Sequence, residues 1–317
     1  MDLCVTVDDI RAAARRIHDR VLRTPLRYSS WLSERTGSDV FLKLETIQPT
    51  FSYKIRGAFN AVLSLRERLG DDAPPLVTAS AGNHGRALAH AAKAAKLPLT
   101  VYAPRNAPRT KLDAIQSAGA VLEPCRDYDE AEVRAKEHAE RTHSTYISPY
   151  SHPDVIAGAG TIGLEILADQ PHIDSIVVPI GGGGLISGIA IAVTESASCK
   201  VHGVEVEAST PFTRALAAGR IVPIEVGETV ADGLSGNLDP DTVTFDIVRS
   251  LVDRIDIVTE PQLVHAISGL AKVEKLIVEG AGAAATASLL AGSTPARCIA
   301  VIVSGANIDV EKLRALL

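Results

Sequence analysis

The chain has 317 residues and a hydrophobic content of 46%, which is enough for one large domain or two medium ones. Its formal net charge is -6 at pH 7, with basic and acidic residues mixed along the chain. This pattern lacks the basic tract that binds nucleic acid or anionic lipid, so we expect no nucleic-acid partner and no membrane partner.

The four cysteines lie far apart and form no C-x-x-C pair. This spacing argues against a structural zinc site and against a disulfide framework, and it suits a reducing compartment. The first twenty residues lack the apolar block of a signal peptide. The longest apolar runs, such as Ile186 to Val193, are too short to span a bilayer. We therefore expect a cytoplasmic protein.

Three elements are predicted before residue 50. Thr6 or Asp8 can cap a helix that runs to about Val21, because apolar residues recur there at helical spacing. A short helix around Trp31 and a strand over 40–44 follow.

From residue 76 onward, apolar runs of strand length alternate with alanine-rich helical runs. The first series has strands at 76–78, 99–102, 121–122 and 146–147, with helices at 84–96, 110–118 and 130–141. The second has strands at 175–179, 201–206, 255–258 and 298–303, with helices at 157–168, 186–195, 262–275 and 283–290. The irregular, polar region 217–240 is predicted to be loop.

Strands that alternate with helices and are apolar throughout predict parallel sheets covered on both faces. The fold class is therefore α/β, with two open, twisted, mostly parallel sheets. We expect a small inserted α/β domain over 51–147, and a large domain made of 1–50 and 148–317.

A run of four glycines joins the predicted strand over 175–180 to a helix. Glycines allow a tight turn that points successive N–H groups inward, and the helix N-terminus adds its dipole, so this geometry favours an anion. A plain tight turn is the alternative. No Gly-Lys-Ser/Thr follows, and Ile186 or Ser187 stands where a dinucleotide motif needs its last glycine. A lone phosphate group fits better than a nucleotide.

Three further stretches carry chemistry-bearing residues. Lys54 follows an aromatic residue at a helix-like segment, with Pro49 and Thr50 before it as turn and cap material. The other two are Ser-Ala-Gly-Asn-His-Gly over 80–85 and Ser-Gly-Ala-Asn over 304–307. Taken singly, each has an ordinary interpretation: a solvated lysine, a helix cap or a strand end.

Together and in this order, these stretches resemble the fold-type-II pyridoxal-phosphate (PLP) enzymes, and more narrowly the threonine/serine dehydratases. The similarity covers nearly the whole chain and includes the segments 49–58, 155–161 and 231–234. It implies the tryptophan-synthase-β-like fold, pyridoxal 5'-phosphate as cofactor, a small amino-acid substrate and a homodimer.

The resemblance also implies roles for single residues. Lys54 is expected to form the Schiff base with the cofactor and then to act as the base at Cα. The other expected cofactor-binding residues are Tyr53, Asn83, Gly181, Gly182, Gly183, Gly184, Leu185, Glu279 and Ser304. The substrate carboxylate is expected on the loop of Ser80, Ala81, Gly82, Asn83 and His84. Glu279 can equally be a solvated charge at a helix start.

The implied reaction removes water from a β-hydroxy amino acid of the L-threonine or L-serine type, giving a 2-oxo acid and ammonia. Alternatives on the same fold are a racemase, a β-replacement synthase and a dehydratase of hydroxyectoine breakdown. A nicotinamide-dependent oxidoreductase is disfavoured by the glycine spacing. Ala81 stands where similar serine racemases have serine, which favours elimination. Ser209 and Pro211 occupy the segment where some relatives bind a divalent cation, so no metal site is predicted.

Overall fold

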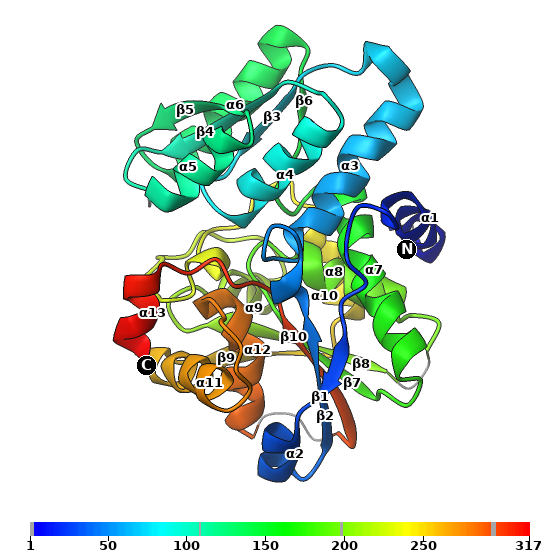
Figure 1. Cartoon of the computed structure of the whole chain (residues 1–317), viewed down its shortest axis with the longest axis vertical. Helices are drawn as coiled ribbons and strands as arrows, with labels where there is room; N and C mark the ends of the chain where they lie inside the picture. The colour runs from blue at the N-terminus through cyan, green and yellow to red at the C-terminus, as the bar shows by residue number, and fades with distance from the viewer. Residues whose placement is uncertain (1–2, 108, 197–198, 293–295) are drawn as a thin grey trace.

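The computed structural model describes residues 3–107, 109–196, 199–292 and 296–317. It contains two β-sheets, each packed against helices (Figure 1). The large sheet has the strand order β1-β2-β10-β7-β8-β9. Its strands are β1 (Leu26–Tyr28), β2 (Asp39–Leu44), β7 (Ser175–Pro179), β8 (Lys200–Val206), β9 (Arg254–Val258) and β10 (Cys298–Val303). The small sheet has the order β5-β4-β3-β6, formed by β3 (Leu76–Ala79), β4 (Leu99–Pro104), β5 (Val121–Cys125) and β6 (Thr145–Tyr146).

Every strand pair is parallel except β1 with β2, which confirms the α/β class with two mostly parallel sheets. The helices around the large sheet are α1 (Val7–Ile17), α2 (Ser30–Thr36), α7 (Pro153–Asp169), α8 (Gly184–Ala192), α9 (Pro211–Ala218), α10 (Thr244–Leu251), α11 (Glu260–Lys272), α12 (Gly280–Leu290) and α13 (Val310–Leu316). Helices α4 (Asn83–Ala94), α5 (Arg109–Ser117) and α6 (Tyr128–Thr142) form, with the small sheet, the small unit. Helix α3 (Lys54–Leu69) leads into it.

The large sheet is buried on both faces because its strands are apolar throughout. In β10, Ile299, Val301 and Val303 pack into the cluster that contains residues of α11 and α12. The alternate residues Ala300 and Ile302 pack into the cluster that contains residues of α7, α8 and α10. One strand with two-residue periodicity therefore serves both hydrophobic layers.

The structure adds short elements that the sequence patterns do not predict: β1, α9, α10 and α13. Several predicted ends are also wrong by a few residues. Helix α1 ends at Ile17 rather than near Val21, and α11 ends at Lys272 rather than 275. The predicted loop over 217–240 contains the last residues of α9 and a 3-10 turn over Asp232–Leu234. Thr6 is the N-cap of α1, with a complete capping box.

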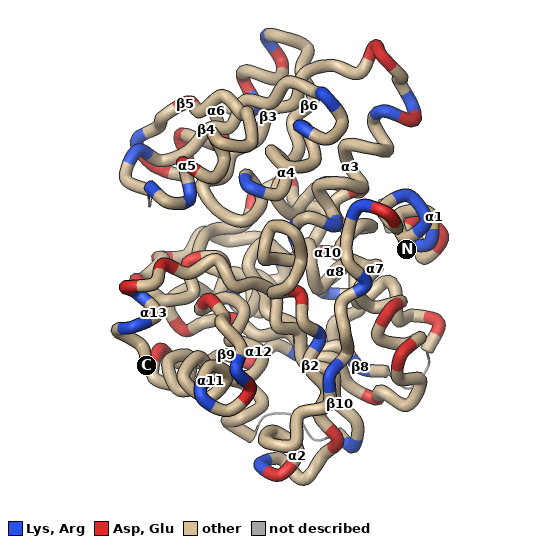
Figure 2. The backbone as a smooth tube through the Cα atoms, viewed as in Figure 1, with Lys and Arg blue, Asp and Glu red and all other residues tan. Residues whose placement is uncertain are grey.

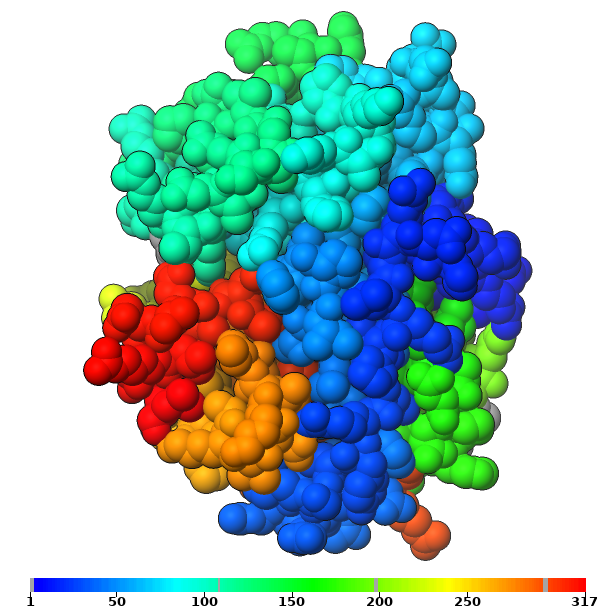
Figure 3. Space-filling model, in the orientation of Figure 1, coloured from blue at the N-terminus to red at the C-terminus, as the bar shows by residue number. Residues whose placement is uncertain are grey.

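Both signs of charge are distributed over the two units (Figure 2). In the described part of the chain, no helix combines the length and the apolar character needed to cross a bilayer. The C-terminal segment meets the small unit (Figure 3), where Arg86 donates to Asn307 at 2.7 Å and Thr110 donates to Asp309 at 2.7 Å.

Helix α3 is held against α7 at a contact of backbone with backbone. A Cβ on Gly57 would lie 2.7 Å from the carbonyl oxygen of Val155, and a Cβ on Gly158 would lie 2.6 Å from that of Arg56. Only glycine permits this approach. The first turn of α3 is therefore fixed relative to α7.

A buried ionic network fixes the same turn. The fully buried Arg56 guanidinium binds both oxygens of Glu45, at 2.8 Å each, and both oxygens of Glu165, at 2.7 and 2.9 Å. It also donates to Thr161 at 3.1 Å. Lys43, also fully buried, donates to Glu165 at 2.6 Å. Two cations and two carboxylates balance, so the network carries no unpaired buried charge.

We expect Arg56→Met to destabilise the protein by ~3–5 kcal/mol, because Glu45 and Glu165 lose their bidentate partner while remaining buried. The measurement is the urea midpoint of the cofactor-free protein. Arg68→Met is the matched control on the same helix: Arg68 is 58% exposed, and its contact with Asp154 is long, at 3.4 Å. Equal midpoints for the two variants would show that the network contributes nothing to stability.

Candidate active site

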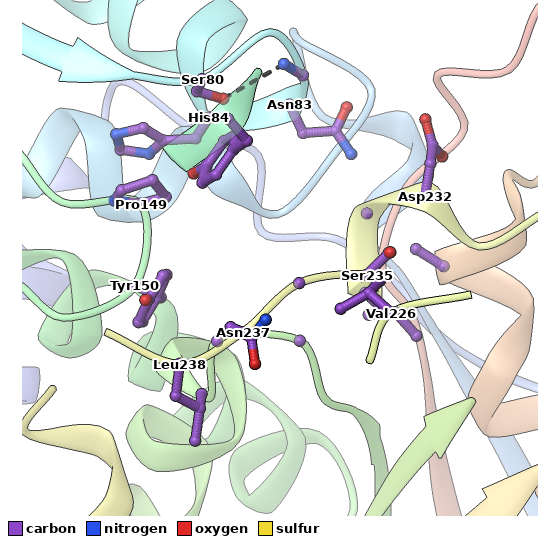
Figure 4. Close-up of a pocket in the computed structure, with 18 of the residues that line it drawn as sticks. Ser80, Asn83, His84, Pro149, Tyr150, Val226, Asp232, Ser235, Asn237 and Leu238 are labelled. Atoms are coloured by element: carbon purple, nitrogen blue, oxygen red, sulfur yellow. Dashed lines mark hydrogen bonds between the residues drawn. The ribbon is translucent and has the colours of Figure 1, made fainter. Parts of the chain in front are cut away.

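A cavity of about 1270 Å³ receives residues from the small unit and from the loops beside the large sheet. The close-up in Figure 4 shows Ser80, Asn83 and His84 on one side of it, with Ser235 and Asn237 on the other. The sequence-predicted site residues all line this cavity: Tyr53, Lys54, Ser80, Ala81, Gly82, Asn83, His84, Gly181, Gly182, Gly183, Gly184, Leu185, Glu279 and Ser304.

Lys54 is the first residue of α3, and its Nζ donates to the carbonyl oxygen of Pro149 at 2.8 Å. The same nitrogen lies 5.2 Å from the centre of the Tyr53 ring. The prediction that Thr50 caps this helix is wrong, because Tyr53 occupies the N-cap position without a side-chain cap bond. The lysine amine is thus held by a neutral carbonyl at the cavity wall.

The segment before Lys54 is joined to the 304–306 segment that follows β10. The N–H of Tyr53 donates to the carbonyl of Ser304 at 3.0 Å, and the N–H of Ala306 donates to that of Phe51 at 2.8 Å. Ser304 is 5% exposed. Residues about 250 positions apart in the sequence are therefore neighbours at the cavity.

The glycine run forms the turn between β7 and α8. Gly183 adopts a φ of 85°, in the left-handed region that favours glycine. A Cβ on Gly182 would lie 2.2 Å from the Tyr150 ring, and a Cβ on Gly184 would lie 2.8 Å from the Tyr150 carbonyl oxygen. The turn needs glycine for packing, and it leaves the N-terminus of α8 at the cavity wall, where backbone N–H groups favour an anion.

Asn83 lies at the centre of a chain of amide and carboxyl contacts. Its Nδ2 donates to Glu279 Oε1 at 2.6 Å, and its Oδ1 accepts from Asn307 Nδ2 at 2.7 Å. Asn307 also donates to the carbonyl of Thr50 at 2.9 Å and accepts from Arg86 at 2.7 Å. These contacts fix both ends of the Asn83 amide.

Glu279 is buried, with 4% of its surface exposed. Burial raises the pKa of this carboxyl to about 7, against the opposing effect of the hydrogen bond from Asn83. Of the two sequence interpretations, the solvated helix-start charge is therefore wrong. A carboxyl that is partly protonated near neutrality lies beside Asn83.

The loop of Ser80 to His84 is closed by its own hydrogen bonds. Ser80 Oγ accepts from the N–H of Gly82 at 3.3 Å and from that of Gly85 at 3.1 Å. The His84 ring is buried, and its Nε2 lies 3.3 Å from the carbonyl oxygen of Ile147, to which it donates. Burial lowers the pKa of His84 to about 3, and the nearby Lys54 charge acts in the same direction. His84 is therefore a neutral imidazole.

Several cavity residues lack a sequence signal that could identify them. Tyr150, Glu132, Lys136 and Asp239 line the cavity from α6 and from two loops, and only the folded chain brings them together. Asn307 is different, because it ends the Ser-Gly-Ala-Asn stretch and could have been read from that pattern.

The described residues contain no group of three or more His, Cys, Asp or Glu side chains placed to hold a metal ion. Glu205, which precedes Ser209 and Pro211 in the chain, binds α9. Its fully buried carboxylate accepts from the N–H groups of Phe212 and Thr213, at 2.7 and 3.0 Å, and from the Thr213 hydroxyl at 2.6 Å. These bonds provide acceptors for backbone N–H groups in the first turn of α9.

Cys4, Cys125, Cys199 and Cys298 are free thiols rather than members of a disulfide.

A comparison with known protein families identifies the family of this chain. The family model described as pyridoxal-phosphate dependent enzyme matches residues 17–305. The chain belongs to this family, and the cofactor predicted from the sequence is confirmed.

Individual relatives are similar to this chain over nearly its whole length. An L-threonine ammonia-lyase of Thermotoga maritima is 39% identical over 312 residues, which is 98% of this chain and 77% of that protein. A serine racemase of Homo sapiens is 37% identical, over 97% of this chain and 92% of that one. Among solved structures, the processed form of threonine deaminase isoform 2 from Solanum lycopersicum matches with a TM-score of 0.90 and 33% identity, over 98% of this chain and 91% of that one.

The Glu279 carboxyl predicts a pH-dependent stability of the cofactor-free protein. Its pKa in the folded state is raised above the ordinary value of 4.5, so the folded state holds this proton more tightly. The resulting stability is present below about pH 4.5 and is lost as the pH rises toward 7. Glu279→Gln cannot ionise, so we expect it to gain on the order of 2 kcal/mol relative to the parent between pH 5 and pH 8.

The free energies come from urea unfolding at each pH. Glu140→Gln, on the exposed side of α6, is the control and should keep a constant difference from the parent. A constant difference for Glu279→Gln would mean that Glu279 ionises as freely in the folded protein as in the unfolded one.

Proposed function

We propose that the protein is a PLP-dependent ammonia-lyase that removes water from a β-hydroxy amino acid and releases a 2-oxo acid and ammonia. The observation that carries the proposal is Lys54, a primary amine at the wall of a cavity that also presents a glycine-lined helix N-terminus and the loop of 80–84. The relatives named as threonine ammonia-lyases support it.

The cavity residues suit the parts of the cofactor. Lys54 would supply the amine for its aldehyde, the turn of Gly181 to Gly184 with Leu185 would supply N–H groups for its phosphate, and Ser304 would supply a neutral hydroxyl for its ring nitrogen. Asn83, held by Glu279, would supply an amide for its ring oxygen. Tyr53 would lie beside it. When bound, pyridoxal phosphate acts as the electron sink for the bond cleavage at Cα.

The protein's own contribution is placement and proton transfer. The loop of 80–84 at the N-terminus of α4 binds the substrate carboxylate, which orients the Cα–H bond toward Lys54 Nζ. Lys54 takes that proton, and the Cβ–O bond breaks with loss of water. Hydrolysis of the released enamine consumes one water and gives the 2-oxo acid and ammonia, so the atoms balance.

The residue Ala81, on the loop of 80–84, favours elimination over racemisation. A racemase needs a second proton carrier opposite the lysine, and the methyl group of Ala81 cannot donate or accept a proton. His84 does not replace it, because its Nε2–H is bound to the Ile147 carbonyl and burial lowers the pKa of the ring to about 3, so the ring does not hold a second proton near neutral pH. We further propose a cytoplasmic homodimer in which 51–147 is the small domain and 1–50 with 148–317 is the large one.

Lys54→Ala is expected to abolish both elimination and the near-visible absorbance of the PLP-loaded enzyme, because no amine remains to bind the aldehyde. The measurements are the absorbance spectrum and 2-oxo acid release. Lys93→Ala, at an exposed position on α4, is the control and should retain both. A borohydride-reducible linkage that persists in the Lys54 variant would place the cofactor on another lysine.

Elimination is expected to exceed racemisation greatly in the parent, and Ala81→Ser is expected to raise racemisation relative to elimination. The assay incubates each protein with L-serine in deuterated water and follows pyruvate and deuterated D-serine over time. The proton source would then be the new hydroxyl. Equal rates of D-serine and pyruvate formation in the unmutated protein would refute the lyase assignment in favour of a racemase.

A further inference from the structure

A chain of hydrogen-bonded side chains leads to Asn83 on the cavity wall (Figure 4). Arg86 Nη1 donates to Asn307 Oδ1 at 2.7 Å. Asn307 Nδ2 donates to the Thr50 carbonyl at 2.9 Å and to Asn83 Oδ1 at 2.7 Å. Asn83 Nδ2 donates in turn to Glu279 Oε1 at 2.6 Å. Every link from Arg86 to Glu279 therefore passes from donor to acceptor in the same direction.

The groups at the start of this chain fix the orientation of both amides. The nitrogen and oxygen of an amide side chain are almost equal in size, so shape alone does not decide which one faces a neighbour. The Arg86 guanidinium can only donate, so it requires the Asn307 oxygen. The Thr50 carbonyl can only accept, so it requires the Asn307 nitrogen. The other N–H of Asn307 then requires the oxygen of Asn83.

Glu279, on the other side of Asn83, does not fix the orientation by itself. An ionised carboxylate only accepts, whereas a protonated carboxyl can also donate. Burial raises the pKa of Glu279 to about 7, so both forms are present near neutral pH. The protonated form can bind the Asn83 oxygen, and the ionised form can bind its nitrogen. Asn307 is therefore the neighbour that sets the orientation of Asn83 at any pH near neutrality.

The orientation decides which atom Asn83 presents to the cavity. Its Nδ2 carries two hydrogens, and Glu279 accepts one of them. Among the residues that the structure describes, no hydrogen bond uses the second one, and Asn83 belongs to the cavity lining. In the reversed amide, an oxygen would occupy the place of this N–H group. That oxygen would repel an anionic acceptor such as the ring oxygen of pyridoxal phosphate.

The chain of hydrogen bonds also joins the two units. Asn83 and Arg86 belong to α4 of the small unit, whereas Asn307 follows β10 and Thr50 precedes α3. The Arg86 guanidinium lies 5.2 Å from the centre of the Phe51 ring, which holds it beside Asn307. An amide of the small unit is thus oriented by a residue that follows the large sheet.

We propose that Asn307 is a positioning residue for the cofactor: it holds Asn83 so that an N–H group, rather than the amide oxygen, faces the ring oxygen of pyridoxal phosphate. The proposal rests on the proposed function, since it requires Asn83 to contact that ring oxygen. Asn307 is not among the described residues that line the cavity of about 1270 Å³, so it acts through Asn83.

The test compares two substitutions that a packing role and an orienting role rank in opposite order. Asn307→Asp keeps the size of the side chain and the acceptor for Arg86, but it replaces the donor to Asn83 by an acceptor and so favours the reversed amide. Asn307→Ala removes these contacts without favouring reversal. The measurement is the apparent dissociation constant of PLP, obtained by titrating the cofactor-free protein and following the near-visible absorbance.

We expect Asn307→Asp to weaken PLP binding about tenfold or more, as the loss of one charge-assisted hydrogen bond allows, and to weaken it more than Asn307→Ala does. Thr110→Val is the matched control. The Thr110 hydroxyl donates to Asp309 at 2.7 Å, so this contact also joins the small unit to the C-terminal segment. Its loss should leave PLP binding unchanged.

Both Asn307 variants are also made together with Asn83→Ala. Without an amide to orient, neither should weaken PLP binding further, whereas a general effect of the added charge or of altered packing would persist. Asn307→Ala gives this comparison even where Asn307→Asp does not fold. An equal loss with and without the Asn83 amide would overturn the proposal, and so would a larger loss in Asn307→Ala than in Asn307→Asp.

The single variants separate this proposal from the proposed function. Unchanged PLP binding in both Asn307 variants, with weaker binding in Asn83→Ala, overturns the role of Asn307 and leaves the cofactor contact of Asn83 standing. Unchanged binding in Asn83→Ala overturns that contact and the role of Asn307 with it. Absence of 2-oxo acid release from the parent, with the dissociation constants in the expected order, supports the role of Asn307 and overturns the lyase.

Discussion

The pairing of Arg56 with Glu45 and Glu165 is the constraint on which the rest of the site depends. These three residues come from the first turn of α3, from the segment after β2 and from α7, so one guanidinium joins three parts of the fold. Buried ion pairs add little net stability compared with apolar residues of the same volume, but they tolerate one geometry only. Lys54 lies two residues before Arg56, and its direction into the cavity follows from that geometry.

The architecture could be predicted from the sequence because it depends on local sequence patterns. Continuous apolar strands such as 298–303 predict a sheet covered on both faces, and glycine runs between a strand and a helix predict a tight turn. The elements that could not be predicted depend on partners in a neighbouring element. Strand β1 has three residues and pairs with β2, and the first turn of α9 is capped by Glu205 from the end of β8. The residues of each short element alone do not contain these partners.

The same distinction holds within the site. Lys54, Asn83 and the glycine run could be found because each stands in a short stretch of recognisable composition. The contact between Asn83 and Asn307 spans 224 positions, and the ion pair of Lys136 with Asp239 joins α6 to a distant loop. A net charge of -6 for the whole chain gives no indication that one part of a cavity wall is acidic.

The polar groups around Lys54 suit proton transfer. Beside the reacting carbon, the polar groups are a carbonyl that holds Lys54, a neutral imidazole at His84 and a carboxyl at Glu279 that is partly protonated near neutrality. Among the residues that the structure describes, the hydrogen-bond partner of Lys54 Nζ is a carbonyl rather than a carboxylate. A neutral partner suits a base that must accept and return a proton.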